Sequence, residues 1–266
     1  MHCNGESRRV AVHPRARAGL VALAVVAVSC VVSQTTPPVQ PSLPATLPID
    51  PPSARRGALV YERNCVACHG DRGDGRGISA PYLVPKPRNF VSAVYKCRLT
   101  PTGSLPLPSD LRRTIDNGSH ATAMPGWKVL GDAQVDDVIE YIRSFSPRWE
   151  KEKVSTPVDL PPETADTAES RVHGRAVYEH LLCGSCHGPR GEGNGPAVPT
   201  LHDESGAPIV PFDFTSARQL RCGAEPIDLY RTFVTGLDGT PMPSYAGQMK
   251  PDEGWDLVHY LMSLRH

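Results

Sequence analysis

A cysteine–histidine motif occurs twice in the sequence. Cys65-Val-Ala-Cys68-His69 is followed 118 residues later by Cys183-Gly-Ser-Cys186-His187. Two thiols at this spacing can each form a thioether with one vinyl group of a haem, and the adjacent histidine can then coordinate the iron. A zinc site would need four grouped ligands, and a dithiol redox pair would follow a strand in a βαβ unit. Neither context surrounds either motif, so the sequence predicts two covalently attached haems c.

Each motif is followed at the same distance by a methionine. Met124 lies 55 residues after His69, and Met242 lies 55 residues after His187, each directly before a proline. A thioether ligand raises the reduction potential of haem iron, which suits an electron carrier. We therefore expect His69/Met124 and His187/Met242 as axial pairs. The alternative distal ligands are His120 in the first copy and Met249 or His259 in the second.

A glycine-rich loop follows each histidine, at 70–77 and at 188–195. Because glycine has no Cβ, we expect these loops to pass close to the haem edge. A backbone carbonyl in such a loop can accept the Nδ1 proton of the histidine and fix its tautomer. Pro196 is the expected acceptor in the second copy, and Ile78 takes that place in the first.

The repeat extends beyond the motifs and predicts two domains. Asp110-Leu-Arg-Arg-Thr114 matches Asp228-Leu-Tyr-Arg-Thr232, again at an offset of 118. Two copies indicate duplicated domains rather than a solenoid. We place the two domains at 53–149 and 172–266. The polar segment 150–171, which holds three prolines, is the expected linker.

Both copies are predicted to be helical at their two ends. The segments 53–64 and 171–182 are compatible with helices that lead into the motifs. Apolar residues at helical spacing predict a last helix in each copy, with Asp132 and Pro251 as start signals. These apolar residues are Val135, Val138, Ile139 and Ile142 in the first copy, and Leu257, Val258, Leu261 and Leu264 in the second. The glycine- and proline-rich stretches between show no strand alternation, so the expected class is all-α.

The N-terminal 32 residues have the layout of an export signal. Four arginines precede an apolar run that is too short for a transmembrane helix of about 20 residues. Ala27-Val28-Ser29-Cys30 resembles a lipobox, which makes Cys30 a candidate for lipidation. The alternative is an uncleaved membrane anchor. The proline-rich segment 33–52 is the expected tether, and the mature protein is expected in the periplasm.

Composition excludes some functions. The 266 residues include 28 Lys and Arg against 28 Asp and Glu, so bulk charge does not indicate nucleic-acid binding. Aromatic residues make up only 6% of the chain, so few large side chains are present to fill a core. A bulky apolar cofactor would fill the remaining space. The segment 57–149 has 12 basic and 9 acidic residues, whereas 172–266 has 7 and 11. Opposite signs on the two halves would allow each to dock a different redox partner.

Two further cysteines lie outside the motifs at matching places in the repeat. Cys97 and Cys222 can form a disulfide in an oxidising compartment, or they can be two separate buried thiols. Arg98 and Arg221 flank them. Each arginine can pair with a haem propionate or be an ordinary surface residue.

Both halves resemble class I cytochrome c domains, and together residues 53–266 resemble bacterial di-haem, two-domain c-type cytochromes. The resemblance implies a small helical bundle around each haem and electron transfer through an exposed haem edge, with redox proteins as partners. The expected function is therefore electron transfer rather than catalysis. A haem-bearing docking subunit of a larger oxidoreductase is the first alternative. A di-haem peroxidase is the second, and two matched methionines argue against it because a peroxidase needs a displaceable distal ligand.

Overall fold

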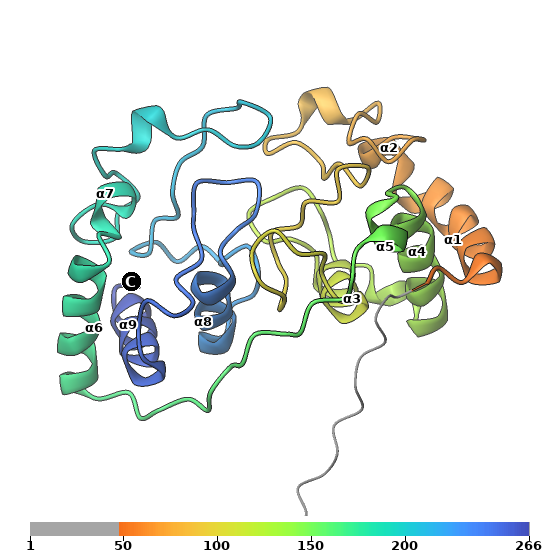
Figure 1. The fold of residues 1–266 in the computed structure, drawn as a ribbon. Helices are drawn as coiled ribbons and strands as arrows, with labels where there is room; N and C mark the ends of the chain where they lie inside the picture. The colour runs from red at the N-terminus through yellow and green to blue at the C-terminus, as the bar shows by residue number, and fades with distance from the viewer. Residues whose placement is uncertain (1–47, 266) are drawn as a thin grey trace, which may run out of the picture. The chain divides into compact units, whose positions relative to one another are not determined.

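The computed structural model describes residues 48–265, and the ordered elements of this stretch are helices (Figure 1). An isolated bridge between His202 and Pro208 is the only β-pairing in the described part. The expected all-α class is therefore confirmed. The predicted export signal, the lipidation candidate Cys30 and most of the predicted tether lie outside the described residues.

The first half contains five α-helices and two 3-10 helices. These are α1 (Pro51–Asn64), α2 (Val66–His69), η1 (Ala80–Tyr82), α3 (Pro108–Asn117), η2 (Lys128–Leu130), α4 (Asp132–Ser144) and α5 (Arg148–Lys151). The second half repeats the order without a counterpart of η2 or α5. Its elements are α6 (Ala168–His180), α7 (Gly184–His187), η3 (Val198–Thr200), α8 (Pro226–Thr235) and α9 (Pro251–Ser263). None of these described helices is long and apolar enough to cross a membrane.

The first helix of each half begins at a polar cap. The Asp50 side chain accepts a hydrogen bond from the Ser53 backbone N–H, and the Thr167 side chain accepts one from that of Ser170. Pro51 and Pro52 form the first turn of α1, where a missing N–H costs nothing. The predicted tether therefore ends too late, since its last two prolines belong to the helix.

The sequence prediction missed α3 and α8, which lie in stretches expected to be loops. Each begins with a proline, Pro108 or Pro226. Two residues later an aspartate accepts a hydrogen bond from the backbone N–H of the residue before the proline, at 3.0 Å for Asp110 and 3.2 Å for Asp228. Proline followed by an N3 acid is a helix-start signal. The repeat had placed these aspartates in register, so the signal was present.

In each half the first helix crosses the long C-terminal helix, α4 or α9, at a glycine. Helix α1 packs on α4, and α6 packs on α9. A Cβ added to Gly57 would lie 1.9 Å from the Asp137 carbonyl oxygen, and one added to Gly174 would lie 1.9 Å from that of Asp256. The two backbones can approach this closely only because glycine occupies the crossing point.

Gly57→Ala and Gly174→Ala are each expected to destabilise the fold by about 3 kcal/mol, because the added methyl group overlaps backbone that cannot rotate away. Urea unfolding followed by circular dichroism measures the loss. Gly184→Ala is the matched control, since its Cβ would meet no atom closer than 3.6 Å. A Gly57→Ala variant as stable as this control would contradict the crossing.

Each half has its own apolar core. In the first, Tyr61 of α1 packs with Phe90 and with Val135 and Val138 of α4. In the second, Tyr178 of α6 belongs to the corresponding cluster, together with Phe214, Trp255 and Val258. The two clusters share no residue. The duplicated sequence therefore builds two separate cores.

The predicted linker 150–171 contacts both halves. Its ends belong to α5 and α6, and residues 152–167 between them form no helix. The Val158 N–H donates to the Leu99 carbonyl of the first half at 2.8 Å. In the second half, Trp255 Nε1 donates to the Pro161 carbonyl at 3.1 Å. The segment is thus packed against the structure at two points along its length.

Candidate functional site

The two motifs lie on one-turn helices that follow the first helix of each half. Cys65 caps the end of α1, where its N–H donates to the Tyr61 carbonyl, and α2 then carries Cys68 and His69. In the second half Leu182 adopts a positive φ of 55° just before Cys183. Burial raises the pKa of the Cys65 and Cys183 thiols to about 11, so both are protonated at neutral pH.

A backbone carbonyl orients the histidine of each motif. His69 Nδ1 lies 3.0 Å from the Arg88 carbonyl oxygen, and His187 Nδ1 lies 3.0 Å from that of Phe212. A carbonyl can only accept, so Nδ1 carries the proton and Nε2 keeps the lone pair that binds a metal. The expectation of a carbonyl acceptor is correct. The choice of Pro196 is wrong, because the acceptor comes from the segment after the glycine loop.

An aromatic ring lies against each histidine. Phe90 stacks on His69 with 4.5 Å between ring centroids, and Phe214 lies 4.9 Å from His187. Burial lowers the pKa of both imidazoles, against the opposing effect of the carbonyl hydrogen bond. A neutral imidazole at neutral pH is the form that can ligate iron.

The glycine loops pack against their own motif helices. A Cβ on Gly77 would lie 2.3 Å from the Ala67 carbonyl, and one on Gly195 would lie 2.4 Å from that of Ser185. The N–H of Gly77 donates to the Cys68 carbonyl at 3.1 Å. These two glycines therefore allow the loops to close over α2 and α7, a contact that the sequence did not predict.

The two methionines lie in loops with the same hydrogen bonds. The Met124 N–H donates a hydrogen bond to Thr122 Oγ1 at 3.1 Å, and the Met242 N–H donates one to Thr240 Oγ1 at 3.2 Å. The Met124 carbonyl accepts from the Ser119 N–H, and the Met242 carbonyl from that of Leu237, both at 3.1 Å. Both side chains are half-buried. The two loops are thus built alike and hold the two thioethers in equivalent places of the repeat.

Among the alternative distal ligands, His259 is buried and contacts other segments of the second half. Its ring is 2% exposed, and its Nδ1 lies 3.0 Å from Ser170 Oγ on α6. Glu163 lies 3.9 Å from its Nε2. His259 therefore links α9 to α6 and to the chain just before it. Met249 packs at the edge of the second core.

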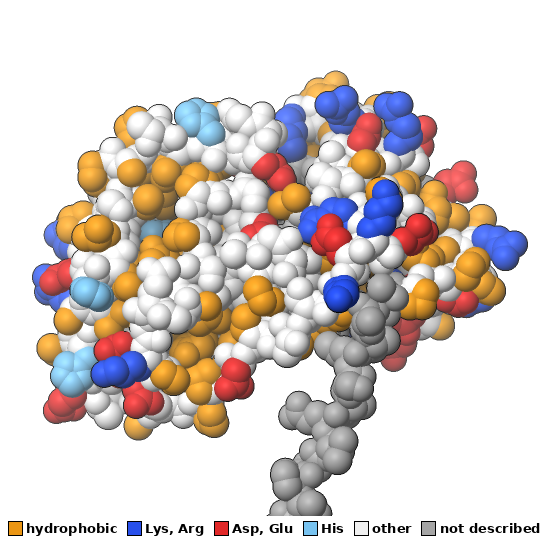
Figure 2. Space-filling model, viewed as in Figure 1, with side chains coloured by type: hydrophobic (Ala, Val, Ile, Leu, Met, Phe, Trp, Pro, Cys, Tyr) orange, Lys and Arg blue, Asp and Glu red, His pale blue; other side chains and the backbone are white. Residues whose placement is uncertain are grey.

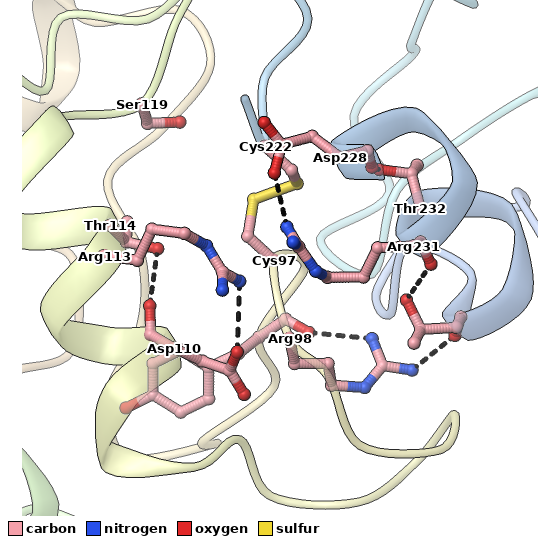
Figure 3. The surroundings of a disulfide bond; sticks show 12 residues. Cys97, Arg98, Asp110, Arg113, Thr114, Ser119, Cys222, Asp228, Arg231 and Thr232 are labelled. Atoms are coloured by element: carbon pink, nitrogen blue, oxygen red, sulfur yellow. Dashed lines mark hydrogen bonds and ion pairs between the residues drawn. A yellow bond between two sulfur atoms is a disulfide. The ribbon is translucent and has the colours of Figure 1, made fainter. Parts of the chain in front are cut away.

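A disulfide joins Cys97 to Cys222, with 5.2 Å between the Cα atoms (Figure 3). An arginine–aspartate pair stands on each side of it (Figure 3). Arg113 donates to Asp110 at 3.0 Å, and Arg231 donates to Asp228 at 2.6 Å. The same pair therefore occurs in both copies of the repeat, one beside each cysteine.

The prediction of an ordinary surface residue is wrong for Arg98, which is buried against the second half. Its side chain is 0% exposed, and Nη2 donates at 2.7 Å to Asp238 Oδ1 and to the Thr235 carbonyl of the second half. Asp238 also accepts from Thr102 Oγ1 and from the Gly103 N–H of the first half. This buried pair ties the halves together beside the disulfide.

The residues of both sites fit haem c. Each motif offers two thiols and one imidazole whose free Nε2 can take iron, and each histidine has an aromatic neighbour suited to an apolar macrocycle. Within residues 48–265 no group of three or more His, Cys, Asp and Glu side chains is placed to hold a metal ion by itself. Two thiols and one histidine per site match haem c, whose porphyrin would supply four further iron ligands.

Comparison with known proteins places a cytochrome in each half. The family model described as cytochrome C oxidase, cbb3-type, subunit III matches residues 52–142, and the cytochrome c model matches residues 172–265. The Azospirillum sp. (strain B510) protein described as cbb3-type cytochrome c oxidase subunit CcoP is 32% identical over 97 residues. That alignment covers 34% of this chain and only 28% of the relative.

A solved structure is similar over most of the chain. It is a chain of the Kuenenia stuttgartiensis reducing HAO-like protein complex, with 39% identity and a TM-score of 0.77. The alignment covers 85% of this chain and 100% of that one. The matched domains indicate haem c as cofactor and electron transfer as function. The chain therefore belongs to the two-domain c-type cytochromes.

Proposed function

We propose that this protein transfers electrons through two covalently attached haems c. Cys65 and Cys68 hold the first haem, and Cys183 and Cys186 hold the second. The observation that carries the proposal is the duplicated motif in which a backbone carbonyl, 3.0 Å from Nδ1, leaves Nε2 of the histidine free. Haem c supplies a one-electron Fe(III)/Fe(II) couple, and the protein contributes the ligands and their orientation.

The proposed axial ligands are His69 with Met124, and His187 with Met242. Their support is the equal spacing in sequence and the matching hydrogen bonds of the two methionine loops. The carbonyls of Arg88 and Phe212 hold the histidine tautomers. A methionine on the distal side raises the potential, as a carrier in a respiratory chain requires.

The comparisons favour a subunit of a larger oxidoreductase over a free carrier. One relative is described as an oxidase subunit, and the solved relative belongs to an HAO-like complex. The partner proposed here is accordingly a redox protein that stays bound. Charged side chains of both signs lie interspersed on the face drawn in Figure 2, so the opposite net charges of the halves form no single patch there. Copurification of a second protein in mild detergent tests this arrangement.

The proposal also places the protein in the periplasm. The export signal lies within residues 1–32, and cleavage before Cys30 leaves a lipidated cysteine that keeps the chain at the membrane. The support is the arginine-rich start, the short apolar run and the lipobox-like sequence. Metabolic labelling with a radioactive fatty acid, with Cys30→Ser as control, tests the lipid.

Intact mass after acid–acetone extraction is expected to retain two haem masses per chain, because thioether bonds survive extraction. The double variant Cys65→Ser/Cys68→Ser is expected to retain one, and so is Cys183→Ser/Cys186→Ser. The disulfide double variant Cys97→Ser/Cys222→Ser is the matched control and retains both. Loss of both haems from the extracted wild type would contradict covalent attachment.

A further inference from the structure

Two cations occupy equivalent places beside the disulfide and lack a hydrogen-bonded partner. Lys96 directly precedes Cys97, and Arg221 directly precedes Cys222. Both side chains are half-buried. Within residues 48–265, neither head group donates a hydrogen bond or forms an ion pair. A desolvated cation without a partner costs free energy, so this pair is a candidate anion site.

The carboxylates nearby already have partners. Glu204 forms an ion pair with Arg88, which bridges the two halves. Asp203 accepts hydrogen bonds from Ser205 and from the Ala207 N–H. Three cations therefore lie near two carboxylates, which leaves an excess of one positive charge, and neither Lys96 nor Arg221 forms a hydrogen bond with either carboxylate.

The pKa shifts of Lys96 and Arg221 agree with an excess of positive charge around them. Burial lowers the pKa of Lys96 to about 8, and repulsion from Arg88 and Arg221 adds to the decrease while Glu204 and Asp203 oppose it. Burial also lowers the pKa of Arg221, with Arg88 adding repulsion. Each cation is thus desolvated and repelled by the others, and an added anion would relieve both costs.

The chain connects Lys96, Arg221 and Arg88 to both haem sites. The Arg88 carbonyl holds His69, its side chain reaches Glu204, and Lys96 follows eight residues later. In the second half, Arg221 follows nine residues after Phe212, whose carbonyl holds His187. Each haem c carries two propionate carboxylates, which are the anions that the proposed function brings to this region.

We propose that Lys96 and Arg221, together with Arg88, form one anion site shared by the two halves, which binds propionate carboxylates of both haems. The inference rests on the proposed function, since it needs both haems. It makes the boundary between the halves a part of each haem site. A cation removed from one half should then change the potential of both haems.

Redox titration of the full-length holoprotein at pH 7 tests the shared site. Lys96→Gln and Arg221→Gln are each expected to lower both midpoint potentials, because loss of positive charge beside the carboxylates favours ferric iron. Lys96→Arg keeps the charge and is expected to restore the wild-type values. Arg55→Gln, an exposed position at the start of α1, is the control and leaves both potentials unchanged.

Glu204→Gln is expected to shift the midpoint potentials in the opposite direction. This test remains valid even if the other variants fail to fold. The substitution frees Arg88 and is expected to raise both potentials. Unchanged potentials, or shifts confined to one haem, in Lys96→Gln, Arg221→Gln and Glu204→Gln would overturn the shared site while leaving the proposed function intact. A wild-type chain without two haems would overturn both proposals, and a haem count made first separates these cases.

Discussion

Met124→His lowers the midpoint potential of the first haem by roughly 0.3 V and leaves the second nearly unchanged. A second imidazole replaces the thioether that favours ferrous iron, and axial ligands set haem potentials over a range of about 0.8 V. Met242→His is expected to do the same for the second haem alone. Spectroelectrochemical titration measures both values, and the sulfur-to-iron charge-transfer band of the ferric protein halves in each variant.

Met249→Leu is the matched control for this experiment. Met249 packs at the edge of the second core and was the other methionine considered as a ligand in that half. Its replacement by a side chain of similar volume is expected to leave both potentials and the charge-transfer band intact. If Met249→Leu removes half of the band while Met242→His does not, Met249 is the ligand of the second haem.

Removal of the disulfide is expected to lower the free energy of unfolding by about 5 kcal/mol. Cys97 and Cys222 are 125 residues apart, and the chain-entropy relation for a loop of this length yields about that value. The double variant Cys97→Ser/Cys222→Ser is unfolded in guanidinium and compared with the wild type. The Arg98–Asp238 pair remains in this variant, so the halves keep this buried polar contact and the difference in stability reports the disulfide.

A reductant makes the same comparison without a mutation. Thioether bonds to haem are not reduced by thiols, so a thiol reductant acts on the disulfide and on the two haem irons. The irons are reduced in both proteins, so the loss of stability of the wild type beyond that of the double variant reports the disulfide. Equal unfolding midpoints for wild type and variant, both without reductant, would contradict the predicted contribution.

Local signals in the sequence were sufficient for the motifs and for the helices α1, α4, α6 and α9. Asp132 and Pro251 begin α4 and α9 as predicted, because helix starts are encoded within a few residues. The attachment motifs and the all-α class were also readable. Sequence alone could place the four proposed axial ligands in register, and the structure adds that the two methionine loops share their hydrogen bonds.

Contacts between distant segments could not be read in the same way. Gly57 and Gly174 look like ordinary helix residues until the opposing helix is seen 1.9 Å from their missing Cβ. Arginine is usually a surface residue, and the partner that buries Arg98, Asp238, lies 140 residues away in the sequence. The acceptors for the two histidines, Arg88 and Phe212, are separated by 124 residues instead of the repeat offset of 118.

The pairing of first with last helix has a consequence for the order in which the protein is made. Synthesis runs from the N-terminus, so α1 exists long before α4, its packing partner. Until α4 is complete the first half cannot close, and Cys65, Cys68 and His69, directly after α1, stay accessible. The same interval recurs between α6 and α9. Each attachment motif thus has its own period of access during biogenesis, and the first period ends before the second begins.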